Sequence, residues 1–232
     1  GYCAWSIAGR VDVVESEQIH VAPGLSLHYR GRLPPQHGLT LDGDNLSPIT
    51  RRHEAQDREF LAYMPSSIPY RLRPTASALI LQPRGGLDMA IALEMGARAV
   101  TVVDEPEAIV TAVRDIYAKW TGQLYRDPKA SLYVGDARNA LERIEQRFDI
   151  VQLSLAETYR PLVSGAYSLS ESHLYTVEAM DSALRRLAPG GILVVTRWLQ
   201  DPPSECLRAA ALVVTALEQQ GVAAVDEHLL AF

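Results

Sequence analysis

Residues 77–104 read SALILQPRGGLDMAIALEMGARAVTVVD, and this stretch decides the fold. It begins with the apolar run 78–81, which Pro83 stops, and it closes with a second apolar run at 99–103. Short apolar runs bounded by breakers are typical of parallel strands that are covered on both faces. Asp104 follows the second run directly. We therefore expect two parallel strands of one sheet, with a carboxylate at the carboxyl end of the second.

Between these strands the sequence predicts a tight turn and a helix. Gly85 and Gly86 open the segment 87–95, in which apolar residues recur with the helical period, and Gly96 ends it. The order strand, glycine turn, helix, strand and acid is that of a Rossmann unit, in which backbone N–H groups of the first turn face the polar part of a ligand. The glycine-rich fingerprint itself is incomplete, because residues 82–86 supply only two glycines.

Asp104 has two possible roles. In a Rossmann unit, an acid at this strand end accepts hydrogen bonds from ribose hydroxyls. An aspartate just before a helix that starts near Pro106 also serves as an N-cap. One side chain can perform both roles, so both interpretations stay open.

The rest of the chain after Asp104 alternates helices and strands, which predicts a three-layer α/β domain with a mostly parallel sheet. We expect helices at 108–120, 137–144, 173–187 and 204–220, and strands at 131–134, 148–155 and 192–196. Pro189-Gly190-Gly191 predicts a turn before the last of these strands. Residues 222–232 have room for one more strand at most.

The first third of the chain follows a different pattern. Alternation with period two, punctuated by Pro-Gly and Asp-Gly pairs, predicts a small antiparallel β-meander with strands at 18–21, 25–29 and 39–42. A short helix near Glu59 leads toward the strand at 77. We place the boundary near Arg73-Pro74, so that 1–74 forms an N-terminal β-domain and 75–232 the Rossmann-like domain. The apolar residues 1–9 could be the stub of a longer segment.

Composition excludes several classes of function. A net charge of −6 argues against nucleic acid as a partner, because phosphate binding needs a basic surface. The six histidines show no metal-ligand spacing, and Cys3 and Cys206 form no metal or redox motif, so we expect no metal and a reducing compartment. No apolar run of about eighteen residues exists, so we expect no membrane span in this chain.

Further polar candidates follow the third and fourth strands of the Rossmann part. Asp136 can accept a hydrogen bond from an adenine amino group, or it can cap the helix that begins at Ala137. Beyond the fourth strand, carboxylates and aromatic rings that suit a cationic amine gather in one loop and the helix start after it: Glu157, Tyr159, Tyr167, Glu171 and Tyr175. Glu171 is equally explained as a first-turn acid of a helix, and the tyrosines as packing residues.

Several motifs, taken in their order, resemble the spermidine synthase family. The similar segments are Leu41-Asp42-Gly43 (family L-D-G), 104–114 (E-I-D-P-x-V-V-x-x-A-R), 135–138 (G-D-G-R), 174–178 (L-Y-T-x-E-F) and 187–193 (L-x-P-G-G-x-L). Residues 152–155, 168–171 and 196–198 resemble one branch of the family more closely, the spermidine-synthase-like proteins often fused to membrane segments.

This resemblance implies a class I methyltransferase-type Rossmann fold behind a small N-terminal antiparallel β-domain. It implies S-adenosylmethionine or decarboxylated S-adenosylmethionine as co-substrate, with Asp104 on the ribose, Asp136 and Ala137 at the adenine, and Arg84, Gly85 and Gly86 at the first turn. It also implies a small-molecule amine substrate and a cytoplasmic domain, and it allows a homodimer and a membrane-fused protein. The family closes its sheet with a C-terminal hairpin, for which 222–232 is too short, so we expect a piece of a longer protein.

Two departures bear on the reaction. The family's G-G-G-D-G-G is replaced by residues 82–87, so its aspartate becomes Gly85, and we expect Arg84 beside it to favour a ligand that bears a carboxylate. The catalytic D-x-x-D pair corresponds to Ser154 and Glu157, and a serine needs an activating partner to act as a base. We expect transfer of an aminopropyl or methyl group to an amine or other nucleophile; the alternative is a binding or scaffolding domain that has lost the chemistry.

Overall fold

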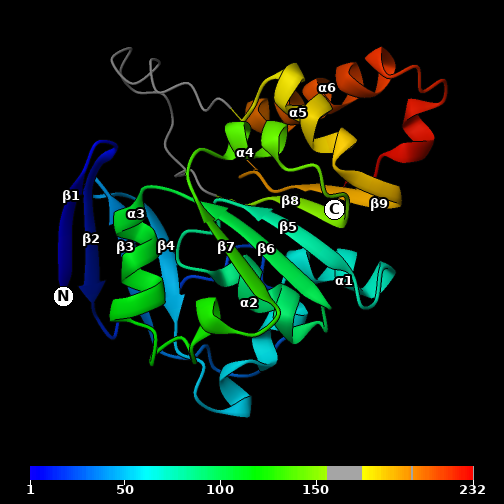
Figure 1. Ribbon diagram of the computed structural model, residues 1–232. Helices are drawn as coiled ribbons and strands as arrows, with labels where there is room; N and C mark the ends of the chain where they lie inside the picture. The colour runs from blue at the N-terminus through cyan, green and yellow to red at the C-terminus, as the bar shows by residue number, and fades with distance from the viewer. Residues whose placement is uncertain (156–173, 200, 232) are drawn as a thin grey trace.

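The computed structural model describes residues 1–155, 174–199 and 201–231, which two β-sheets organise (Figure 1). The first sheet is antiparallel, with the order β1 (Tyr2–Ser6), β2 (Gly9–Glu15), β3 (Gln36–Leu41) and β4 (Asp44–Thr50). The second is parallel, with the order β7-β6-β5-β8-β9. Its strands are β5 (Ser77–Leu81), β6 (Ala99–Asp104), β7 (Ala130–Val134), β8 (Phe148–Leu153) and β9 (Leu187–Val195).

Helices cover both faces of the parallel sheet, so the expected three-layer Rossmann fold is confirmed. One face carries α4 (Ala137–Arg143), α5 (Val177–Arg185) and α6 (Ser204–Gln219), and the other carries α2 (Leu87–Glu94) and α3 (Glu107–Thr111) (Figure 1). The short helix α1 (Ile68–Leu72) leads into β5. The antiparallel sheet lies beside α3, at one end of the parallel sheet.

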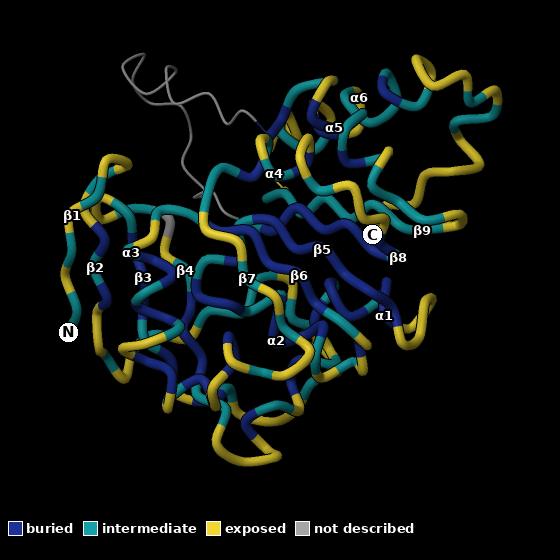
Figure 2. The backbone as a smooth tube through the Cα atoms, in the orientation of Figure 1, coloured by how far each residue is buried: buried dark blue, intermediate teal, exposed yellow. Residues whose placement is uncertain are grey.

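The side chains of β5 explain why two helical layers are needed. Ala78 and Ile80 belong to the hydrophobic cluster on the α2 side, whereas Leu79 and Leu81 belong to the cluster on the α5 side. Successive residues of a strand point to opposite faces, and all four are fully buried. Burying one such large side chain contributes roughly 1.5–3 kcal/mol. Figure 2 shows the same order of burial across the sheet, with β5 and β8 more buried than the edge strands β7 and β9.

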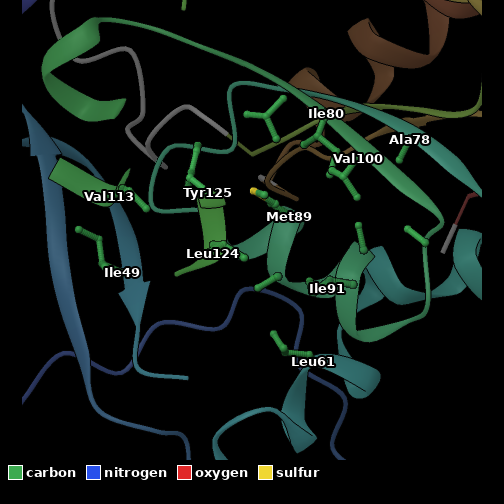
Figure 3. Close-up of a cluster of buried hydrophobic side chains, with 14 of the residues drawn as sticks. Ile49, Leu61, Ala78, Ile80, Met89, Ile91, Val100, Val113, Leu124 and Tyr125 are labelled. Carbon is green, nitrogen blue, oxygen red and sulfur yellow. The ribbon is translucent and has the colours of Figure 1, made fainter. Parts of the chain in front are cut away.

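One continuous core joins the N-terminal part to the Rossmann part. Ile49 of β4 and Leu61 lie in the same cluster as Met89 and Ile91 of α2 (Figure 3). Trp120 adds a polar tie, because its indole N–H donates to the carbonyl of Ile49 at 3.1 Å. The antiparallel sheet is therefore packed against the turn that follows β5, which places it next to the expected ligand site.

The N-terminal sheet exists, but the predicted strands at 18–21 and 25–29 are wrong. Residues 16–35 form turns, closed by bonds such as those from the N–H groups of Leu25 and Tyr29 to the carbonyls three residues earlier. Leu25 and Tyr29 pack against the core from this loop, whereas Leu27 is exposed, so the alternation here does not reflect strand pairing. The missing strands come instead from residues 2–15, including the segment interpreted as a possible stub.

The Leu41-Asp42-Gly43 motif forms the hairpin between β3 and β4. Asp42 and Gly43 both have positive φ, +52° and +76°, as a two-residue type I′ turn requires. The Asp42 carboxylate also accepts a hydrogen bond of 2.7 Å from the backbone N–H of Arg10, which fixes the hairpin to β2.

Several elements differ from the prediction in their boundaries. The helix expected at 108–120 is the five-residue α3 followed by a π-helical turn at Ala112–Ile116. Helix α5 begins at Val177, where the Thr176 side chain caps it, and β8 ends at Leu153. Strand β9 continues through Pro189-Gly190-Gly191 with a shift in register, because it pairs with β8 at Leu187 and again from Ile192 to Val195. Between 222 and 231 the structure has a 3₁₀ turn, Val225–His228, which agrees with the expectation of one more strand at most.

Within the described ranges, no helix has the length and apolar character needed to cross a bilayer.

Candidate functional site

A hollow of about 590 Å³ lies at the carboxyl ends of β6 and β7. We call it the β6–β7 hollow; it is lined by the β1–β2 turn with Trp5, Ser6, Ile7 and Ala8, by Leu41 and Arg84, by residues 105–108 at the start of α3, and by Val134 and Gly135. Ligands of open α/β sheets bind at this end of the strands. The hollow is therefore the first candidate for the adenosyl part of a ligand.

Asp104 ends β6 directly before Glu105, which lines the hollow, and is itself fully buried behind this lining. Its Oδ2 accepts a hydrogen bond of 2.8 Å from the backbone N–H of Arg84, and its Oδ1 accepts one of 2.9 Å from the N–H of Glu105. The Arg84 guanidinium comes within 3.7 Å of Oδ1. Helix α3 has Pro106 at its N-cap position, so Asp104 is not the N-cap of this helix. Because the carboxylate exposes no surface, a ligand hydroxyl can reach its remaining lone pairs only if a neighbouring group such as Arg84 moves aside.

Burial raises the pKa of Asp104 to about 6, although Arg84 and the two backbone N–H groups oppose the rise. Burial also raises the pKa of Glu105, and the like charge of Asp136 adds to that rise. Three carboxylates and one guanidinium therefore meet at this strand end. Their balance favours a cationic ligand such as a sulfonium.

Arg84 does not extend into solvent, and its side chain is 14% exposed. Its backbone is in the left-handed region with φ of +54°, and its guanidinium donates to the carbonyl of Glu105. A cation already paired with Asp104 attracts a ligand carboxylate less strongly than a free one. The geometry therefore weakens the expectation that Arg84 selects a ligand with a carboxylate.

Gly85 and Gly86 are packed by the protein itself. The N–H of Gly85 donates to Ser47 Oγ at 3.0 Å, and a Cβ at Gly85 would lie 2.6 Å from the carbonyl carbon of Pro48 and closer still to its oxygen. Gly86 has φ of +89° and faces Leu124. Both glycines allow β4 and the following loops to approach the turn closely, so the structure gives them a packing role beside the ligand role proposed from the sequence.

Asp136 caps α4, as one of its two interpretations predicted. Its Oδ1 accepts a hydrogen bond of 2.8 Å from the backbone N–H of Asn139. It follows β7, which pairs with β6 so that Asp104 is opposite Val134. Ala137 is buried at the first position of the helix. Only one carboxylate oxygen of Asp136 is used in capping. The role of Asp136 at the adenine stays a proposal.

The two roles of Asp136 can be separated by substitution. Asp136→Ala should lower the free energy of unfolding by about 1 kcal/mol because the cap is lost, whereas Asp136→Ser should keep most of it. If Asp136 also binds adenine, both variants should bind S-adenosyl ligands several-fold more weakly. Urea unfolding and calorimetry measure the two effects. Wild-type affinity in Asp136→Ser would assign Asp136 to capping alone.

Ser154 follows β8 directly and is 5% exposed, with its N–H bonded to the carbonyl of Leu81. Its hydroxyl makes no hydrogen bond within the described parts of the chain. Four other candidates, Glu157, Tyr159, Tyr167 and Glu171, lie outside the described residues.

Tyr175 is described and buried. The Arg197 guanidinium lies 3.9 Å from the centre of its ring, and the same guanidinium is 2.5 Å from a carboxylate oxygen of Glu205. One face of this ring thus already binds a cation of the protein, and its proposed contact with a substrate needs another face or the hydroxyl.

Two polar residues near the site, Asp88 and Gln152, were not predicted from the sequence. Gln152 is a fully buried amide in the apolar strand β8, and Asp88 lies in the first turn of α2. Both left a trace in the sequence: a polar residue inside an apolar run, and a carboxylate two residues after the glycine pair. Among the described residues, no group of histidine, cysteine, aspartate and glutamate side chains is arranged to hold a metal.

The fold and the site define a class I methyltransferase-type Rossmann domain preceded by an antiparallel sheet. No family model matches the chain. A polyamine aminopropyltransferase from Korarchaeum cryptofilum is 27% identical over 95 residues, which are 41% of this chain and 27% of that protein. Sequence similarity to aminopropyltransferases is therefore present over part of the chain.

Solved structures extend the resemblance to nearly the whole chain. The crystal structure of spermidine synthase from Thermotoga maritima matches 93% of this chain and 63% of its own, with a TM-score of 0.61 and 15% identity. A spermidine synthase in complex with the transition-state analogue AdoDATO matches 94% of this chain and 62% of its own, with a TM-score of 0.57 and 17% identity. The resemblance to the spermidine synthase family is confirmed, and the chain spans less than two thirds of these relatives.

Proposed function

We propose that this chain binds a nucleoside sulfonium and transfers its aminopropyl group to a small-molecule amine. The observation that carries the proposal is the fully buried carboxylate of Asp104 at the carboxyl end of β6, beside a hollow large enough for a nucleoside. In Rossmann domains, an acid at this position accepts hydrogen bonds from ribose hydroxyls. The similarity to a polyamine aminopropyltransferase supports the choice of transferred group.

The charge of the site supports a sulfonium co-substrate. Asp104, Glu105 and Asp136 supply three carboxylates against the single guanidinium of Arg84 at the ends of β6 and β7. Ser154 lies two strands away, because the sheet order is β6-β5-β8. Two strand spacings are about 10 Å. An elongated ligand held at Asp104 by its ribose would therefore direct its sulfonium and its transferable chain toward Ser154.

The reaction needs little covalent help from the protein. The acceptor nitrogen attacks the carbon next to sulfur, the carbon–sulfur bond breaks, and sulfur keeps the electron pair as a neutral thioether. Holding the two reactants in line can supply roughly 7–11 kcal/mol of the barrier reduction. The acceptor amine must also lose a proton, and we propose that this happens beside Ser154 and Glu157.

We now expect decarboxylated S-adenosylmethionine to bind more tightly than S-adenosylmethionine. Arg84 is paired with Asp104. Asp88, three residues beyond Gly85, places a carboxylate near the first turn. The expectation that Arg84 selects a ligand with a carboxylate did not include this charge. A carboxylate on the ligand would be repelled there.

A binding domain without catalysis is the second candidate. The observation in its favour is the turn at residues 83–86, where the Gly85 N–H and the Arg84 guanidinium already have partners in the protein. Such a domain would bind the adenosyl ligand without turnover.

One experiment separates these functions. The protein is incubated with S-adenosylmethionine or its decarboxylated form, each with and without 1,4-diaminobutane, and products are analysed by mass spectrometry. Aminopropyl transfer predicts an amine that has gained one aminopropyl group, together with the nucleoside thioether. A methylated amine would instead show methyl transfer, and bound ligand without product would show the binding domain.

A further inference from the structure

We propose that Asp88, together with Ser154 and Gln152, forms the position that holds the acceptor amine and takes its proton. This inference rests on the proposed transferase function and names the group that the reaction requires. The cluster brings together the first turn of α2 and the end of β8, which are 66 residues apart along the chain at Asp88 and Ser154.

The fold fixes the position of each member. Gly86, in the left-handed conformation, starts α2 directly after β5, so Asp88 lies in the first turn at the carboxyl end of that strand. Strand β8 is the neighbour of β5, with Gln152 opposite Ile80. Ser154 follows it and binds the backbone of Leu81. The N-terminus of α2 also stabilises a carboxylate in its first turn through the helix dipole.

Two buried polar atoms of this cluster have no partner. Ser154 Oγ and Gln152 Nε2 make no hydrogen bond within the described ranges, although the two residues are 5% and 0% exposed. Gln152 does accept at its other end, where the Tyr70 hydroxyl donates to Oε1 at 3.2 Å. Unsatisfied buried groups are rare in native proteins, and each one needs an explanation such as a ligand or a catalytic role.

The carboxylate of Asp88 is the charged group close to these side chains. Part of its surface remains exposed, yet the packing around it is dense enough that burial raises its pKa. The side chains of Ser154, Ser66 and Gln152 oppose that rise, so all three lie close to the carboxylate, although Ser154 Oγ and Gln152 Nε2 form no hydrogen bond with it. A carboxylate with a raised pKa is a better proton acceptor than a free one.

The proposed step is balanced in charge and atoms. An acceptor ammonium gives one proton to the Asp88 carboxylate and becomes a neutral amine. Its nitrogen then bonds to the carbon next to sulfur, the carbon–sulfur bond breaks toward sulfur, and the new secondary amine carries the positive charge. Asp88 later releases its proton to water. Ser154 orients the amine by hydrogen bonding, which gives the serine a role that its own basicity does not allow.

The decisive variant is Asp88→Asn, which keeps the shape of the side chain and removes its charge and basicity. Glu94→Gln is the matched control, because it makes the same chemical change at the other, exposed end of the same helix. With decarboxylated S-adenosylmethionine and 1,4-diaminobutane, we expect kcat to fall by about 10²–10⁴-fold in Asp88→Asn and by less than about 3-fold in Glu94→Gln. Thermal unfolding of each variant tests whether it is folded.

A binding measurement keeps this inference separate from the proposed function. Calorimetry with 1,4-diaminobutane, in the presence of the nucleoside thioether, should show amine binding that Asp88→Asn weakens at least tenfold while the thioether binds as before. If the protein shows no turnover but binds the amine in a way that depends on Asp88, the proposed transferase function is refuted and the proposed amine site is supported. Unchanged kcat and amine affinity in a folded Asp88→Asn protein would overturn the inference.

Discussion

Replacing Asp104 by asparagine is expected to remove a pH dependence of about 3 kcal/mol from the stability of the protein. The pKa of Asp104 is about 6 in the folded chain and 3.8 for an unperturbed aspartate. Because the folded pKa is the higher one, the stabilising contribution is fully present below pH 3.8 and is lost as the pH rises through 6. A difference of about two pKa units corresponds to about 3 kcal/mol.

The measurement is the free energy of unfolding of wild type and Asp104→Asn in urea between pH 4 and pH 8. The wild type should lose stability relative to the variant by about 3 kcal/mol as the pH rises across this interval. Asp149→Asn serves as a control of opposite sign, because hydrogen bonds from Ser77 lower the pKa of Asp149. Parallel curves for wild type and Asp104→Asn would show that Asp104 has an ordinary pKa.

The same carboxylate should control ligand affinity. If ribose hydroxyls bind ionised Asp104, affinity for decarboxylated S-adenosylmethionine should fall by about tenfold per pH unit below pH 6. Asp104→Ala should weaken binding at least tenfold at pH 7.5, since charge-assisted hydrogen bonds are worth roughly 1.5–3 kcal/mol each. Calorimetry that shows wild-type affinity in a folded Asp104→Ala protein would remove ribose binding from its role.

The second large effect is expected at Gly85. Gly85→Ala would place a methyl group 2.6 Å from the carbonyl carbon of Pro48, and closer still to its oxygen. Both atoms belong to the backbone of β4, so neither can rotate away as a side chain could. We expect a loss of about 3 kcal/mol or more in unfolding free energy, at the upper end of overpacking effects.

Gly96→Ala is the control for this substitution. Gly96 has φ of +85°, but a Cβ at this position would have no atom within 4 Å, so alanine there suffers backbone strain without a clash. We expect a cost of about 1 kcal/mol for that strain. Equal costs at the two positions would mean that β4 shifts easily away from the turn. They would also mean that the close approach of the two sheets does not require glycine at position 85.

The sequence alone determined the core of the Rossmann part. The strands at 77–81 and 99–104 and the helix at 87–94 lie within one or two residues of the prediction. These elements could be predicted because their signals are local: apolar runs with a fixed period, ended by Pro83, Gly86 and Gly96. The position of Asp104 at a strand end follows from the same pattern.

Tertiary structure alone decided the N-terminal strands and the surroundings of the site. An antiparallel strand exists only where a partner pairs with it, and the alternating residues 18–29 have no such partner among the described residues, whereas 2–15 do. The Arg84 guanidinium is paired with Asp104, twenty residues away. Asp88 looks like any first-turn acid until β8 brings Ser154 and Gln152 beside it. Local periodicity specifies elements, but only the packing of distant segments decides which polar groups meet.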